Sequence, residues 1–383
     1  NGSYSIKLRD GEYLANATVS DETYSTKTHV VVDGGIVSQD LLFVSSANKD
    51  EIAYAADIYV GYPKQTNNYA TVNEAVEAAS LMKKDGQART AANRVTIHIA
   101  PGTYREQIIV NTPYISFVND TNEEVLLTWY YGLGYVYYSA GADGYYNAEN
   151  AYDKYEKRRV QNWGTSVYLK SGATAFRADG ITFENSFNRY ITEEELSDGV
   201  EPAVTYSNTP IYGDTKISYV RNRGVDVTAK NATERATAIM IDADQVEFNN
   251  CGFFSSQDTV KTGNSDSIAH MYFKNCVLEG QTDYIFGGGN VVFDACELSW
   301  KGYRDKDKNG KAYSGYITAY KQSDKLKEEV SGNYLEKGYL FRNCTITGNN
   351  YNNLEVGAGY FGRPWGPKAA TTFINTKLKN ADM

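Results

Sequence analysis

Hydrophobic and polar residues alternate in a short segment that recurs along the chain, and a phenylalanine stands at the third position of each copy. Two neighbouring copies begin at Val246 and Met271, 25 residues apart, and the next begins 20 residues later at Val291. Alternation of this kind predicts a β-strand, and the Asn at the fifth position of most copies predicts a turn. Seven copies share one register: Ile115–Asp120, Ile181–Ser186, Val246–Cys251, Met271–Cys276, Val291–Cys296, Tyr339–Cys344 and Thr371–Thr376.

A strand that returns at this period is typical of a stacked solenoid, in which each unit contacts its neighbours. Leucine-rich repeats have a similar period, but the Leu pattern that they need is absent from this sequence. The repeat therefore predicts an all-β fold, a right-handed parallel β-helix. The register predicts one inward stack formed by Phe117, Phe183, Phe248, Phe273, Phe293, Phe341 and Phe373. It also predicts a ladder of turn amides formed by Asn119, Asn185, Asn250, Asn275, Asn343 and Asn375.

The regions outside the repeat complete the predicted architecture. Residues 71–87 have a helical pattern in which Thr71 and Glu74 are spaced as a capping box, so we expect a helix that covers the first coil. We expect two parts, a small β-rich appendage over residues 1–54 and a β-helix over residues 55–383. Long polar loop insertions are predicted in the wide gaps between copies, at 120–181, 187–245 and 297–339.

The composition limits the classes of molecule that the protein is expected to bind. The 383 residues include 38 basic and 47 acidic side chains, and the net charge of −9 opposes general attraction to nucleic acid or to an anionic membrane. No apolar run approaches the roughly 18 residues of a membrane helix. We therefore expect neither nucleic acid nor a membrane as a partner. The 33 Tyr provide amphipathic rings that suit contacts with sugars or proteins. The start at Asn1 has no leader, so we expect a mature or excised fragment of a larger parent chain.

The four cysteines occupy one repeated slot, three residues after the phenylalanine of their copies. They are Cys251, Cys276, Cys296 and Cys344. Small buried thiols suit such a slot, although a disulfide between stacked neighbours such as Cys251 and Cys276 is the alternative. No pair has zinc-type spacing, so we expect no metal and no cofactor. With only three histidines in the chain, a Ser-His-Asp site is weakly supported.

Two acids follow the repeated slot at the same distance. Asp258 is seven residues after Cys251, and Asp283 is seven residues after Cys276. Parallel strands lie about 4.8 Å apart, so equal offsets in adjacent coils predict two neighbouring carboxylates on one face. Such a pair favours one protonated and one ionised member, an acid beside a nucleophile, and the amide of Gln257 is available for an oxyanion. The alternative is that both acids only cap turns.

At these residues the sequence resembles the pectin methylesterases, a family of β-helical carbohydrate esterases. Four motifs occur in the family order across most of the chain: Gly102-Thr-Tyr-Arg-Glu106, Gln257-Asp-Thr259, Asp283-Tyr-Ile-Phe-Gly287 and Gly362-Arg-Pro-Trp365. The resemblance implies a secreted enzyme that acts on methyl-esterified pectin (homogalacturonan) without a cofactor. We expect Tyr104 and Glu106 of the first motif to be structural.

The resemblance also implies roles for individual residues. Asp283 would be the nucleophile, Asp258 the acid and then the base, and Gln257 an oxyanion donor. Arg363 would pair with the nucleophile, and Trp365 would contact the sugar, although a surface ion pair and a core position are the plain alternatives. Tyr284 stands where the family usually has Phe, and it either lines the same cleft or packs in the core.

Two departures from the family pattern leave alternatives open. The family carries a second Gln 22 residues before the Gln of Gln-Asp-Thr, and here that position is Arg235. Arg235 is a charged oxyanion donor, a binding group for a neighbouring free carboxylate, or a sign of weakened chemistry. The chain also ends at Met383, sooner after Trp365 than is usual, so we expect the β-helix to lack its C-terminal end.

Two further functions remain as alternatives to ester hydrolysis. Two carboxyls about 5 Å apart also suit a retaining glycoside hydrolase. A polysaccharide-binding solenoid with degraded or no activity would account for Arg235 and for the Tyr-rich loops.

Overall fold

The computed structural model describes the chain mainly between residues 52 and 379, with gaps. The described residues are 11–13, 16–19, 22–26, 30–32, 43–45, 52–132, 135–136, 164–198, 201–202, 221–230, 232–322, 329–330, 333–334, 338–348, 358–366 and 368–379. Much of the predicted loop insertions, including 137–163 and 203–220, lies outside these residues.

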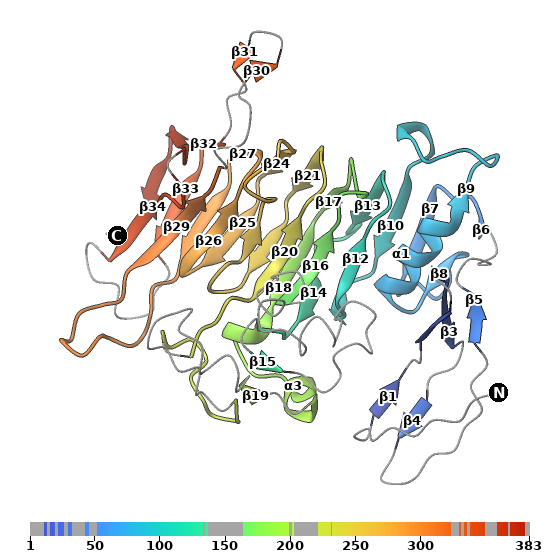
Figure 1. Ribbon diagram of the computed structural model, residues 1–383, viewed down its shortest axis with the longest axis horizontal. Coiled ribbons are helices and arrows are strands. Elements are labelled where there is room, and N and C mark those ends of the chain that lie inside the picture. The colour runs from blue at the N-terminus through green and yellow to red at the C-terminus, as the bar shows by residue number, and fades with distance from the viewer. Residues whose placement is uncertain are drawn as a thin grey trace.

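Three long parallel sheets run side by side along the molecule, and successive coils advance from the blue end to the red end of Figure 1. The first sheet contains β8 (Asn68–Tyr69), β7 (Asp57–Val60), β10 (Val95–Ile99), β13 (Ile115–Val118), β17 (Arg177–Asp179), β21 (Val246–Asn249), β24 (His270–Lys274), β27 (Asn290–Asp294), β32 (Gly338–Arg342) and β35 (Thr371–Ile374), in that spatial order.

The second sheet contains β11 (Gly102–Arg105), β14 (Val125–Trp129), β18 (Ile181–Asn185), β22 (Gly252–Phe254), β25 (Val277–Gly280), β28 (Glu297–Trp300), β33 (Thr345–Gly348) and β36 (Lys377–Lys379). The third sheet contains β12 (Ile108–Val110), β16 (Thr165–Leu169), β20 (Thr237–Ile241), β23 (Val260–Lys261), β26 (Thr282–Gly287), β29 (Gly315–Tyr320) and β34 (Gly359–Gly362). One coil supplies one strand to each sheet, as β24, β25 and β26 do in sequence order. The predicted parallel β-helix is confirmed.

Aromatic rings stack inside the first sheet at the predicted register. The Phe273 ring lies 4.8 Å from the rings of both Phe248 and Phe293, centroid to centroid, and the ring of Phe341 lies 4.5 Å beyond Phe293. These rings are buried, and with the aliphatic residues of the other sheets they form one continuous core. The stack fixes the register, because a slip of one residue would turn every inward side chain outward.

The prediction was wrong for Phe183, which lies on β18 of the second sheet and not in this stack. Its expected place is taken by Ala178, which pairs with Phe117 on one side and Phe248 on the other. Gly180 makes the left-handed turn here with φ 71°, so the copy that contains Phe183 begins after the turn. Apolar and polar residues alternate in the same way in the strands of all three sheets. Only the position of the turn residue shows to which sheet a copy of the repeat belongs.

The turns after the first sheet use left-handed backbone at several predicted Asn positions. Asn250, Asn275, Asn343 and Asn375 have φ between 52° and 56°, a conformation that Asn tolerates better than most residues. The amide of Asn375 donates to the side-chain oxygen of Asn343 at 3.3 Å. The amide ladder is confirmed for this pair.

Other predicted members of the ladder bind elsewhere. Asn250 donates to the carboxylate of Asp179, and Asn343, which accepts from Asn375, itself donates to Asp294. Asn185 ends a strand of the second sheet, where it is buried and donates to backbone oxygens. The four cysteines are buried and free, as expected, so the disulfide alternative is wrong.

Helix α1 (Val72–Leu81) covers the N-terminal end of the coils (Figure 1). Thr71 and Glu74 form the predicted capping box. The carboxylate of Glu106 also accepts hydrogen bonds from the backbone N–H groups of Val72 and Asn73, both at 2.9 Å, which gives Glu106 the structural role that was expected. The helix ends before the predicted residue 87 because Met82–Lys83 continues as strand β9, which pairs with β6 (Ile52–Ala53).

Short elements complete the described chain. Before residue 52, strands β1 (Gly11–Tyr13) and β4 (Val30–Val32) pair antiparallel, and so do β2 (Asn16–Val19), β3 (Glu22–Thr26) and β5 (Phe43–Ser45). The division at residue 54 stays a prediction. The remaining elements are η2 (Ala91–Asn93), η5 (Ser186–Asn188), α3 (Glu193–Asp198) and the pairs β15 (Tyr135–Val136) with β19 (Glu201–Pro202) and β30 (Glu329–Val330) with β31 (Asn333–Tyr334).

Replacing a ring in the middle of the stack should weaken the fold. We expect Phe273→Ala to lower the free energy of unfolding by about 3–5 kcal/mol. The missing ring would leave a cavity between Phe248 and Phe293, and these neighbouring rings cannot move to fill it. Denaturant-induced unfolding followed by circular dichroism measures this. Phe361→Ala is the control, because Phe361 is 49% exposed. Equal losses in the two variants would contradict the role assigned to the stack.

Candidate active site

The two acids singled out in the sequence occupy the same register on adjacent coils of the third sheet. Gln257 pairs with Thr282, and Val260 pairs with Ile285, so Asp258 lies opposite Asp283. Their backbones are therefore about 4.8 Å apart. The predicted register of the two acids on adjacent coils is confirmed, and both residues are 0% exposed.

Both acids have a left-handed backbone conformation, which sets the direction of their side chains. Asp258 has φ 64° and Asp283 has φ 50°, which is unusual for residues other than glycine and is often found at functional sites. The register between β26 and β29 shifts between Thr282 and Ile285, so β26 has one extra residue against β29. A bulge of this kind redirects the side chain that it contains.

Arg363 holds the Asp283 carboxylate from two strands away. It follows β34, and its backbone N–H donates to the carbonyl of Thr318 on β29. Its Nε donates to Asp283 Oδ1 at 2.7 Å, and its Nη2 donates to Oδ2, a bidentate pair. The guanidinium carbon lies 4.7 Å from the ring centroid of Tyr316 on the intervening strand, so this ring packs against the arginine.

Opposing effects set the proton affinity of Asp283. Burial raises its pKa above the ordinary value, and the cations Arg363 and Lys230 oppose this without cancelling it. In turn, the hydrogen bonds to Asp283 raise the pKa of Arg363. The site therefore contains a carboxylate that takes up a proton more readily than a surface Asp, beside an arginine that stays charged.

The structure places the other predicted residues around this pair as follows. Gln257 lies between Arg235 and Thr282 in one row across the third sheet, next to the acids. Arg235 is largely buried, and its Nε lies 3.4 Å from Glu234 Oε1. Trp365 is 43% exposed, and its ring lies 5.8 Å from the Arg363 guanidinium.

Tyr284 does not belong with these residues. Its side chain is 0% exposed within the core of the β-helix, so packing is the correct one of its two alternatives. Because Asp283 is left-handed and bulged, the next side chain turns inward while the acid faces outward. Tyr284 is therefore a core residue and not a substrate contact.

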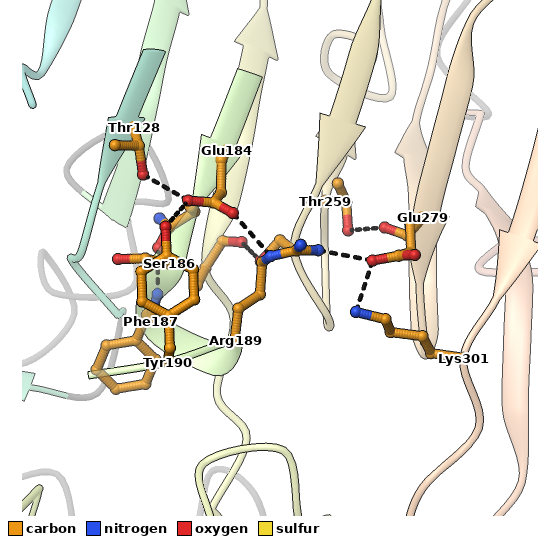
Figure 2. A network of polar contacts seen from close by, with 12 residues as sticks. Thr128, Glu184, Ser186, Phe187, Arg189, Tyr190, Thr259, Glu279 and Lys301 are labelled. Carbon is orange, nitrogen blue, oxygen red and sulfur yellow. Dashed lines mark hydrogen bonds and ion pairs between the residues drawn. The ribbon is translucent and has the colours of Figure 1, made fainter. Parts of the chain in front are cut away.

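A second polar network braces the corner where the second sheet leads into the acids (Figure 2). Arg189 joins Glu184 on β18 to Glu279 on β25, at 2.8 and 2.6 Å, and its guanidinium lies over the ring of Phe254 on the strand between them. Lys301 approaches Glu279 at 2.7 Å. The network thus ties together the strands that precede Asp258 and Asp283.

The cations of this network compensate the cost of burying Glu279. Burial raises the pKa of Glu279, but Lys301 and Arg189 together bring it below the ordinary value. The hydroxyl of Thr259, the residue after Asp258, donates to the backbone oxygen of Glu279 at 2.9 Å. Sequence reasoning missed this network, because Arg189, which joins its two glutamates, comes from a segment after β18 that no repeat specifies.

Comparisons with known proteins place the chain in a family. The family model described as Pectinesterase matches residues 188–381, just over half of the chain. The chain belongs to the pectinesterase family. Pectinesterase 31 of Arabidopsis thaliana is 26% identical over 325 residues, which cover 82% of this chain and 73% of that protein. Probable pectinesterase 8 of the same plant is 33% identical over 144 residues, 38% of this chain and 32% of that protein.

Solved structures of pectin methylesterases have the same fold. PemA from Erwinia chrysanthemi matches with a TM-score of 0.55 and 18% identity, over 85% of this chain and 79% of that one. The enzyme from carrot matches with a TM-score of 0.54 and 19% identity, over 84% and 73%. Among the described residues of this pectinesterase-family chain, no His, Cys, Asp and Glu side chains cluster as metal ligands, and no helix has the length and apolarity to cross a membrane.

The arginine clamp predicts a measurable change in proton affinity. Arg363→Met should raise the pKa of Asp283 further, because the variant loses a cation that lowers it while burial remains. Carboxyl ¹³C shifts of labelled aspartates, titrated with pH and assigned with Asp283→Asn, measure this. Arg342→Met is the control: Arg342 lowers the pKa of Asp294 on the first sheet, so only that pKa should rise. An unchanged pKa of Asp283 in Arg363→Met would contradict the clamp.

Proposed function

We propose that this chain is a pectin methylesterase, which hydrolyses C6 methyl esters of homogalacturonan to free carboxylate and methanol. The observation that carries the proposal is the pair of stacked acids, Asp258 and Asp283, with Arg363 bidentate on the second. Membership of the pectinesterase family supports carboxylic ester hydrolysis. A pectin methylesterase solved in complex with a hexasaccharide matches this fold with a TM-score of 0.54 and supports a saccharide ligand.

In the first half of the proposed reaction, a carboxylate oxygen of Asp283 attacks the C6 carbonyl carbon of the ester. The carbonyl π electrons move to oxygen, and the amide of Gln257 stabilises the resulting oxyanion. The oxyanion collapses, the bond from carbon to the methoxy oxygen breaks, and Asp258 gives its proton to that oxygen. Methanol leaves, and C6 remains bound to Asp283 as an acid anhydride.

In the second half, the newly ionised Asp258 removes a proton from water as the water oxygen attacks C6. The bond from C6 to the Asp283 oxygen breaks, which releases the galacturonate carboxyl and restores the Asp283 carboxylate and the protonated Asp258. Arg363 orients Asp283 throughout and stabilises its ionised form, which burial disfavours. Because the substrate is a cell-wall polysaccharide, we propose that the protein acts outside the cell.

A polysaccharide-binding protein without activity is the second candidate. It is favoured by Arg235 at the position where the family has Gln, and by the complete burial of both acids, which a substrate ester must reach. Methanol release separates this candidate from the esterase. Shortening of the polysaccharide without methanol would support the glycoside hydrolase alternative instead.

Removing the proposed nucleophile should abolish the reaction. We expect Asp283→Asn to lower kcat for methanol release from esterified pectin by about 10³-fold or more, because the amide is a poor nucleophile. Asp294→Asn is the matched control, since Asp294 also pairs with an arginine but lies on the first sheet. If the wild-type protein releases no methanol where a known esterase does, the proposal fails.

Arg235 is proposed as a second oxyanion donor. We expect Arg235→Ala to lower kcat by about 10²-fold, the usual effect of removing one oxyanion donor, and Arg235→Gln to retain most of the activity. The control is Arg223→Ala, which removes an exposed arginine paired with Glu193. An effect on KM alone, larger with partly de-esterified pectin, would instead make Arg235 a binding group for a free carboxylate.

A further inference from the structure

Two insertions of the β-helix meet beside the acid pair. One lies between β18 and β20 and includes residues 221–230, and the other, residues 301–314, lies between β28 and β29. In the third sheet, β20 and β29 flank β23 and β26, the strands that carry the acids or follow them directly. The two insertions therefore reach the acid pair from the coils on either side of it.

Hydrogen bonds join the two insertions at Lys230. Its backbone N–H donates to Asp305 Oδ1 at 2.7 Å. The side-chain amide of Gln281, which is buried just before β26, donates to the carbonyl of Thr228 at 3.4 Å and to the carbonyl of Gly302. Both insertions are thus tied to each other and to the start of the strand that contains the second acid.

The ammonium of Lys230 lies over an aromatic ring of the other insertion. It is 5.0 Å from the ring centroid of Tyr303, which is buried. The hydroxyls of Tyr303 and Thr282 share a hydrogen bond, and Thr282 directly precedes Asp283. The contact between the insertions therefore fixes a cation one ring away from the residue that precedes Asp283.

Lys230 acts on Asp283 through space, whereas Arg363 binds the carboxylate directly. Lys230 is half-buried, and its charge adds to that of Arg363 in lowering the pKa of Asp283. The charged and titratable groups around Asp283 come from five elements: Asp258 on the adjacent coil, Arg235 in the row of Gln257, Tyr316 on β29, Arg363 after β34, and Lys230 and Tyr303 from the two insertions.

We propose that Lys230 is a positioning residue for Asp283, brought to the acid pair by the contact between the two insertions and held there as a second cation beside Arg363. The inference rests on the proposed function for the reaction that Asp283 performs. In that reaction Lys230 favours the ionised carboxylate that attacks the ester, without touching the ester itself.

The first test is the pH dependence of kcat/KM for methanol release by the wild type, Lys230→Met and Lys230→Arg. Asp283 must be ionised to attack, so losing a cation that lowers its pKa should move the rise of kcat/KM at acidic pH to higher pH. We expect Lys230→Met to lose about threefold in kcat/KM on this rise and to match the wild type on the plateau. Lys230→Arg keeps the cation and should follow the wild type throughout.

Methionine keeps the apolar stem of the side chain, so a role of Lys230 in packing alone predicts an unchanged pH profile. Lys308→Met, which removes an exposed lysine from the second insertion, is the control and should leave the profile unchanged. A loss in Lys230→Met that is equal at every pH would make Lys230 a structural residue and overturn the inference.

A matched pair of variants tests the contact that holds Lys230. Asp305→Ala and Asp305→Asn remove the same negative charge, but the asparagine keeps an oxygen that can accept the backbone N–H of Lys230. The pKa of Asp283, measured from carboxyl ¹³C shifts, should be higher in Asp305→Ala than in Asp305→Asn, because the alanine releases Lys230. Equal pKa values in the two variants would contradict the role of this contact.

The ¹³C titration needs no substrate, so it separates this inference from the proposed function. An unchanged pKa of Asp283 in Lys230→Met would overturn the inference even if methanol release is normal. A raised pKa in a protein whose wild type releases no methanol would support the role of Lys230 beside Asp283 and reject the esterase.

Discussion

The in-register stacking of coils is the constraint on which the rest of the structure depends. The phenylalanine stack inside the first sheet prevents a slip between neighbouring coils, because a slip of one residue would turn the rings outward. The same spacing then carries through two turns to the third sheet, so Asp258 and Asp283 meet one coil apart. The proximity of two buried acids, which electrostatics opposes, is thus imposed by the apolar core.

The site keeps an unfavourable arrangement that the surrounding structure compensates. Both acids have left-handed backbone and no exposure to water, and each feature costs free energy. Arg363 offsets part of the cost of burying Asp283, and the chain of charges from Glu184 to Lys301 ties together the strands that lead into the acids. Such strain is expected at positions where the residue serves the chemistry of a site and not the stability of the fold.

The sequence was informative wherever the repeat carried the information. Equal offsets from Cys251 and Cys276 predicted the acid pair, and Thr71 with Glu74 predicted the start of α1. Alternation could not assign the copy at Phe183 to its sheet, because inward positions look alike in all three sheets.

Features set by distant contacts escaped sequence analysis for a related physical reason. The left-handed backbone at Asp283 turns Tyr284 into the core, and nothing in the motif specifies that backbone. Likewise, Arg189 meets Glu279 across 90 residues of sequence, and Tyr316 lies beneath Arg363 only because β29 separates β26 from β34. These contacts depend on how coils are ordered in space, which no local pattern encodes.

The distribution of charge on the third sheet reconciles the acidic protein with the polyanionic ligand that we propose for it. The net charge of −9 would repel pectin carboxylates at long range, but salt screens this field beyond about 8–10 Å. Within that distance the outer face presents Arg235 beside Gln257 and Arg363 at the acids. In the proposed reaction, local cations would therefore govern contact with the polysaccharide, while the overall negative charge would favour release of a product that gains one negative charge with each ester removed.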